Sequence, residues 1–177
     1  RAVQSAAFAG AILVGDNNSG VDTKALKERF PQASLLDFSR EIFDFSREKN
    51  KMLDAVATEW VLFLDSDEVL EEGAGKEIEK LITAKTTGDA TQGKAVSSVA
   101  LQRVDYFLGK PLLWGEVGNT FFVRLFKKDA GKFTRAVHEV FELSVDENRT
   151  VEHCNSFKIH HFSHTSIQDF LRKVATY

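Results

Sequence analysis

One stretch of the sequence carries most of the structural information: Trp60-Val61-Leu62-Phe63-Leu64-Asp65-Ser66-Asp67-Glu68. Its apolar first half is typical of a buried strand, and the acidic residues that follow end that strand abruptly. Carboxylates gathered at the end of a buried strand repel one another unless a cation neutralises them, and hard oxygen ligands suit Mg²⁺ or Mn²⁺. The stretch therefore predicts a strand followed by a divalent-metal site at Asp65 and Asp67. A solvated turn is the alternative interpretation.

The segments on either side of this stretch alternate between strand and helix patterns. Short apolar runs at 11–15 and 34–38 indicate strands, and the periodicity of 23–30, 45–57 and 70–84 indicates helices. After residue 95 the pattern changes to strands, at 95–104, 121–126, 137–143 and 151–159, with a closing helix at 166–177. This order predicts one α/β domain over residues 1–177, with a mainly parallel, Rossmann-like sheet flanked by helices in the first half and more antiparallel pairing in the second.

Composition excludes several classes of protein. The chain has 177 residues, of which 43% are hydrophobic and 28% charged, so it is not a disordered chain. A net charge of -3 argues against nucleic-acid binding, which requires a basic surface. The single cysteine, Cys154, cannot form an internal disulfide, and no run reaches the ~20 apolar residues that span a bilayer. We therefore expect a cytoplasmic domain.

A second carboxylate, Asp16, follows the first predicted strand. In a parallel sheet the carboxyl ends of neighbouring strands meet at one edge, where open α/β sheets bind their ligands. Asp16 can there accept hydrogen bonds from a nucleobase or a ribose. Because Asp16-Asn17-Asn18-Ser19-Gly20 is rich in turn-forming residues, an Asx-turn is the alternative.

These residues resemble family 2 glycosyltransferases of the GT-A fold, especially the bacterial branch close to the lipopolysaccharide-core β-glucosyltransferases. Three departures stand out. The family's second Asp falls one position late, at Asp22, and Lys49 replaces the usual Arg. The family's first strand with its Asn-Glu turn has no counterpart, so we expect an N-terminally incomplete GT-A domain. The family's motifs occur in order over nearly the whole chain: Asp16, Ser19 and Thr23; Phe45 to Asn50; Trp60 to Glu68, which contains the DXD motif; Phe107 to Lys110; Arg124 to Lys127; Val137 to Glu139; and His161 to Lys173.

The resemblance implies an inverting, metal-dependent transferase that builds a bacterial cell-surface polysaccharide such as lipopolysaccharide. Its donor would be a nucleotide sugar, with a UDP-sugar the first expectation, and its acceptor a glycan or a lipid-linked glycan. Contact with the inner face of the cell membrane would follow from a lipid-linked acceptor. The metal, Mg²⁺ or Mn²⁺, would be bound by Asp67, with Asp65 and His138 as further ligands. Donor binding would fall to Asp16, Ser19, Asn50, Asp65 and Arg124.

Inverting transfer requires one general base for the acceptor hydroxyl. Our candidate is Glu139, with Asp105 and Glu116 in reserve; a surface ion pair is the alternative for Glu139, as a strand-edge salt bridge is for Arg124. His160 and His161 are adjacent in a predicted strand and must face opposite sides. The family pattern favours His161 as the residue near the site.

Two other functions remain open. A nucleotidyltransferase also binds a nucleotide and Mg²⁺ on an α/β sheet, although it usually carries a glycine-rich phosphate loop after its first strand. A nucleotide-sugar or glycan binding domain without turnover is the non-enzymatic alternative. Metal-dependent hydrolysis of a nucleotide sugar would distinguish an enzyme from a binding domain.

Overall fold

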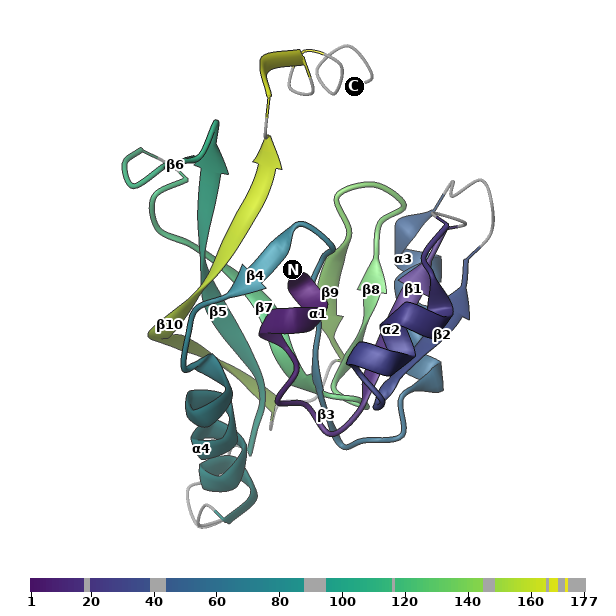
Figure 1. Ribbon diagram of the computed structural model, residues 1–177. Helices are drawn as coiled ribbons and strands as arrows, with labels where there is room; N and C mark the ends of the chain where they lie inside the picture. Colours follow the sequence, from purple (N-terminus) through teal and green to yellow (C-terminus); the bar gives the residue numbers. More distant parts are fainter. Residues whose placement is uncertain are drawn as a thin grey trace.

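The computed structural model describes residues 1–17, 20–38, 44–87, 95–115, 117–144, 149–164, 166–168 and 171. Helices and strands alternate in the first half, and strands dominate the second (Figure 1). In chain order the elements are α1 (Ala2–Ser5), β1 (Ile12–Asp16), α2 (Thr23–Arg29), β2 (Ala33–Asp37), α3 (Phe45–Ala55), β3 (Trp60–Leu62), β4 (Glu68–Leu70), α4 (Ala74–Thr87), β5 (Ala95–Phe107), β6 (Lys110–Pro111), β7 (Thr120–Lys127), β8 (Gly131–Thr134), β9 (Val140–Leu143) and β10 (Arg149–His164).

The largest sheet is mixed, which corrects the expectation of a mainly parallel one. Its strand order is β3-β7-β5-β10-β4, with β6 attached to β5. Among the strand pairs that the structure describes in this sheet, β5–β10 is parallel, whereas β3–β7, β5–β7, β5–β6 and β10–β4 are antiparallel. The helix-linked pair β1–β2 is parallel, as expected of a βαβ unit, and forms a separate two-stranded sheet. The α/β character, the parallel pair β1–β2 and the antiparallel pairing expected in the second half are thus confirmed, whereas β3 pairs antiparallel instead of parallel.

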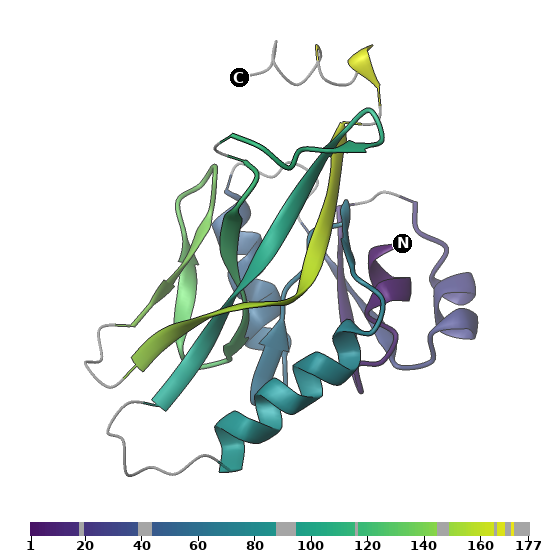
Figure 2. The ribbon, with the colours of Figure 1, turned by 90° about the vertical axis from the view of Figure 1, so that its left-hand side faces the viewer.

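Two hydrophobic clusters hold the layers together. In the first, Ala74 and Ile78 of α4 pack on Leu101, Leu125 and Ile159 of the large sheet. Figure 2 shows α4 running along the sheet that contains β5 and β10. The second cluster joins α3 to the β8–β9 hairpin and the other side of β7, through Leu53, Phe63, Phe126, Phe133 and Phe141. Together the clusters fix α3, β3 and β10 relative to one another.

Two predicted elements begin three or four residues later in the structure than expected. The helix expected at 70–84 begins at Ala74, because Glu68–Leu70 forms β4, in which Leu70 pairs with Ile159 of β10. The strand expected at 137–143 begins at Val140. The loop before it contains His138 at φ 55°, in the left-handed region that a strand cannot use. Most of the closing helix expected at 166–177 lies outside the described residues.

Strand register places three charged residues in one row. Glu68 of β4 is opposite His161 of β10, and His161 is in turn opposite Asp105 of β5. The turn after β3 reaches the same row, since Asp67 O accepts a hydrogen bond from Phe162 N at 2.9 Å. The end of the stretch Trp60–Glu68 is thereby brought against the second half of the chain. In the described part of the chain, no helix combines the length and the apolar character that crossing a membrane requires.

Candidate active site

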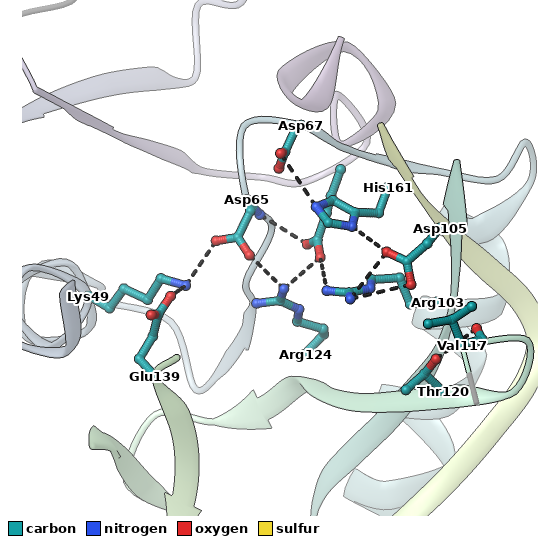
Figure 3. A network of polar contacts seen from close by, with 11 residues as sticks. Lys49, Asp65, Asp67, Arg103, Asp105, Val117, Thr120, Arg124, Glu139 and His161 are labelled. Carbon is teal, nitrogen blue, oxygen red and sulfur yellow. Dashed lines mark hydrogen bonds and ion pairs between the residues drawn. The ribbon is translucent and has the colours of Figure 1, made fainter. Parts of the chain in front are cut away.

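A continuous chain of charged side chains surrounds the turn after β3 (Figure 3). Each contact in it joins an acid to a base, and the members come from α3, the β3–β4 turn, β4, β5, β7, β10 and the loop before β9. Followed from one ion pair to the next, the members are Glu139, Lys49, Asp65, Arg124, Glu68, Arg103, Asp105, His161 and Asp67. We call these residues the charge network.

Asp65 is the centre of the charge network. Its Oδ1 lies 2.9 Å from Lys49 Nζ, and its Oδ2 lies 2.6 Å from Arg124. Burial by itself would raise the pKa of Asp65, but the positive charges of Arg124 and Lys49 outweigh it and lower the pKa to about 2. Both carboxylate oxygens are therefore engaged by cations, so Asp65 orients the turn from within the protein.

Behind Asp65 lies a buried ion pair between Arg124 and Glu68. Arg124 contacts Glu68 Oε1 at 2.6 Å, and Glu68 is completely buried. Glu68 Oε2 also accepts a hydrogen bond from Asp65 N at 3.0 Å, which ties the turn to β4. Burial would lower the pKa of Arg124, but Asp65 and Glu68 raise it overall. The Arg124 guanidinium thus forms a salt bridge within the sheet, which was the alternative interpretation of this residue. Contact between Arg124 and a diphosphate stays a prediction.

His161 lies between two carboxylates at the other end of the charge network. Its Nδ1 is 2.5 Å from Asp105 Oδ1, and its Nε2 is 3.4 Å from Asp67 Oδ2. Burial lowers the pKa of His161, but its hydrogen bonds with Asp105 and Asp67 raise it to about 9. The same contact is the main reason that the pKa of Asp67 is lowered. His160 faces the opposite side, with its ring against Tyr106, so the expected division between the two histidines is confirmed.

Glu139 reaches the charge network through Lys49. The Lys49 ammonium contacts Asp65 Oδ1 on one side and Glu139 Oε1 on the other. The side chains of Lys49 and Glu139 are 11% and 19% exposed, so this is a partly buried contact and differs from the surface ion pair that was the alternative. The candidate base therefore lies beside the acidic turn.

The other predicted site residues are found at several places in the fold. Asp16 is partly buried at the carboxyl end of β1, and His138 is exposed in the loop before β9. Asn50 exchanges hydrogen bonds with the backbone of Phe133, at 2.9 Å each, and so fastens α3 to β8. Ser19 and Glu116 lie outside the described residues.

The residues present can supply part of a divalent-metal site. Among the described residues, no group of three or more acidic, histidine or cysteine side chains is arranged to hold a metal ion. Asp67 is the most accessible carboxylate of the turn, with 38% of its side chain exposed, and His161 Nε2 faces it. Carboxylate and neutral imidazole both ligate Mn²⁺, so Asp67 and His161 could share one ion if metal binding displaces the proton of His161. Water or diphosphate oxygens would be the other ligands.

Sequence reasoning did not foresee the buried ion pair of Glu68, the contacts of Arg103 or the structural role of Lys49. Arg103 joins Glu68 to Asp105 at 3.8 and 3.2 Å, and its guanidinium stacks 4.1 Å from the Phe122 ring centroid. The register of β4, β5 and β10 makes these contacts, and no local motif encodes that register. The sequence offered one signal for these contacts: Arg103 is a charged residue within a predicted strand, and such a residue needs a charged partner when it is buried.

Comparisons with known proteins identify the fold. No family model matches the chain, and no curated protein matches its sequence. Among solved structures, the crystal structure of residues 1–349 of TarS from S. aureus, a glycosyltransferase, matches with a TM-score of 0.53 at 12% sequence identity. The match covers 97% of this chain and 57% of the TarS chain, so this chain spans little more than half of that structure. The likeness shows a glycosyltransferase-like fold.

Proposed function

We propose that this chain is the donor-binding and catalytic part of an inverting glycosyltransferase that uses a nucleotide sugar. One observation carries the proposal: Asp67, His161 and Glu139 are joined by a single charge network at the end of β3, in a glycosyltransferase-like fold. A site for glycosyl transfer needs groups that stabilise the negative charge of the leaving diphosphate, and it needs a general base close to them. The charge network offers both within one arrangement.

Each residue has a distinct task in this proposal. Asp67 and His161 would hold a divalent cation, Mg²⁺ or Mn²⁺, which when bound neutralises the negative charge that develops on the leaving diphosphate. Asp65 keeps the turn in place through Lys49 and Arg124. Glu139 accepts the proton of the acceptor hydroxyl at a carboxylate oxygen, so that the hydroxyl oxygen attacks the sugar.

The finer assignments rest on the motifs that the sequence shares with family 2. They are a UDP-sugar donor with its nucleoside near Asp16, a glycan or lipid-linked acceptor, a place in lipopolysaccharide-core synthesis, and contact with the inner face of the membrane. The same set includes two residue assignments: His138 as a further metal ligand, and Ser19 and Asn50 as donor-binding residues. A binding domain without turnover and a nucleotidyltransferase are the competing proposals.

A ligand screen tests the proposal directly. The purified chain is heated with UDP-, GDP-, CMP- or dTDP-sugars, each with and without Mn²⁺. Release of the nucleoside diphosphate, or of CMP in the case of the CMP-sugar, is measured in parallel. A ligand at a hundredfold excess over its Kd stabilises the fold by about 2.7 kcal/mol, which raises the melting temperature visibly. We expect a metal-dependent shift with one nucleotide class, together with diphosphate release.

The other outcomes discriminate between the alternatives. A metal-dependent shift without diphosphate release, even with candidate acceptors, would favour a binding domain. Release of inorganic pyrophosphate from a nucleoside triphosphate and a sugar phosphate would identify a nucleotidyltransferase. Absence of any shift would contradict nucleotide-sugar binding by this chain.

A further inference from the structure

Lys49 links two carboxylates that belong to different parts of the chain. It lies within α3, and its ammonium is placed between Asp65, from the turn after β3, and Glu139, from the loop before β9 (Figure 3). In the described part of the chain, Lys49 is the one basic side chain within ion-pair distance of Glu139. Within the described residues, the carboxylate of Glu139 is therefore linked to Asp65 through this one ammonium group.

The Lys49 side chain has little freedom to move elsewhere. Its ammonium lies 5.1 Å from the ring centroid of Phe63 and 5.6 Å from that of Phe133, at distances where cation–π attraction is effective. Only 11% of the side chain is exposed, so the ammonium cannot exchange its carboxylate partners for bulk water without large rearrangement. The two rings and the two carboxylates together define one location for the charge.

The helix that carries Lys49 is fastened to the loop that carries Glu139. Phe45 N, at the start of α3, donates a hydrogen bond to Ala136 O at 3.0 Å, and Asn50 is bonded in both directions to Phe133. The same loop holds Arg135 at φ 67°, a strained backbone geometry that persists only where the surroundings enforce it. Helix and loop therefore act as one unit.

From these contacts we propose that Lys49 is the positioning residue that holds Glu139 against Asp65, so that the general base occupies a fixed place beside the donor site. The inference rests on the proposed function, because it takes Glu139 as the base. Lys49 itself touches no reacting atom. Its contribution is geometric: misplacing a catalytic group by about 1 Å can reduce the rate by about a hundredfold.

A double-mutant cycle tests this inference. Lys49→Met keeps the length and the packing of the side chain against Phe63 and Phe133 but removes the charge, and Glu139→Gln removes the base. We expect Lys49→Met to lower kcat by about a hundredfold while the donor KM changes by less than about threefold. In the Glu139→Gln background the same substitution should lower kcat by less than about twofold, since no base is left to position.

Two further variants complete the design. Lys51→Met makes the same change in the same helix at a more exposed lysine, whose contact is Glu48, and should leave kcat at the parental value. Lys49→Arg restores a cation and should recover most of the kcat that Lys49→Met loses. The inference would be overturned if Lys49→Met lowered kcat by the same factor in the parent and in the Glu139→Gln background. It would also be overturned if Lys49→Met raised the donor KM and left kcat unchanged.

The inference and the proposed function can fail separately. If the parent transfers no sugar from any donor, the proposed function fails, and urea unfolding of the same four proteins of the cycle still measures the contact. Coupled changes in the unfolding midpoint would keep Lys49 as the residue that holds Glu139, whereas additive changes would overturn that placement. If Lys49→Met does not fold, Lys49→Gln replaces it in both measurements, with the same criteria.

Discussion

His161 and Asp105 face each other across the parallel pair β10–β5, with His161 Nδ1 2.5 Å from Asp105 Oδ1. The contact fixes which ring nitrogen is directed away from the strand pair, and Nε2 consequently faces Asp67. Asp105, which belongs to β5, therefore orients the His161 ring toward the acidic turn. This arrangement makes the protonation of His161 a property that can be measured.

The first prediction concerns stability against pH in metal-free protein. The pKa of His161 is raised from 6.5 to about 9, so its contribution to stability is complete below pH 6.5 and is lost as the pH rises through about 9. We expect His161→Gln to destabilise the protein by about 2 kcal/mol at pH 6 and by much less at pH 10. Urea unfolding of both proteins across this range, with EDTA present, measures the difference. A gap independent of pH would contradict the assignment.

The second prediction separates the two aspartates of the turn. Asp65 has a cation on each carboxylate oxygen, whereas Asp67 contacts only His161 among the ion pairs of the described residues. Asp65→Asn should therefore cost about 2 kcal/mol of unfolding free energy, because Arg124 and Lys49 lose a charged partner. Asp67→Asn should cost less than about 1 kcal/mol. Equal costs in urea unfolding would show that the two carboxylates do not differ in this way.

The same pair of variants also tests the metal proposal. Asp67→Asn should abolish Mn²⁺-dependent donor binding in isothermal titration calorimetry while the circular dichroism spectrum is unchanged. Asp65→Asn changes the support of the turn, so its binding loss should be accompanied by lowered stability. If Asp67→Asn binds Mn²⁺ and donor as well as the parent does, Asp67 is not the metal ligand.

Local patterns predicted the parts of this structure that depend on local chemistry. The apolar run at Trp60 and the acidic residues after it became β3 and its turn, and the helical pattern that begins at residue 23 became α2. Alternation of side chains along a strand was enough to separate His161 from His160. In each case the physical cause lies within a few neighbouring residues.

The remaining features depend on which segments pair, and the sequence pattern does not encode that. A strand such as β3 has the same apolar pattern whether it pairs parallel or antiparallel, so the parallel direction expected for the strands of the first half was wrong for β3, while the antiparallel pairing expected in the second half was confirmed. The contact between Lys49 and Glu139 arises only when α3 packs on the β8–β9 hairpin. Burial of Glu68 likewise requires two arginines, Arg124 and Arg103, from different strands.

The last prediction concerns that buried glutamate. Glu68 is fully buried, and its carboxylate contacts Arg124 at 2.6 Å and Asp65 N at 3.0 Å. Glu68→Gln keeps the shape but leaves the buried guanidinium without its full charge partner, so we expect a loss of about 3 kcal/mol in unfolding free energy. Glu77→Gln, at an exposed pair with Lys80 on α4, is the matched control and should change stability by less than about 0.5 kcal/mol. Urea unfolding at pH 7 compares the two variants. Similar small effects would show that the Arg124–Glu68 pair is not what holds the turn against β4, and a large effect at Glu77 alone would place the electrostatic support of the fold on α4 instead.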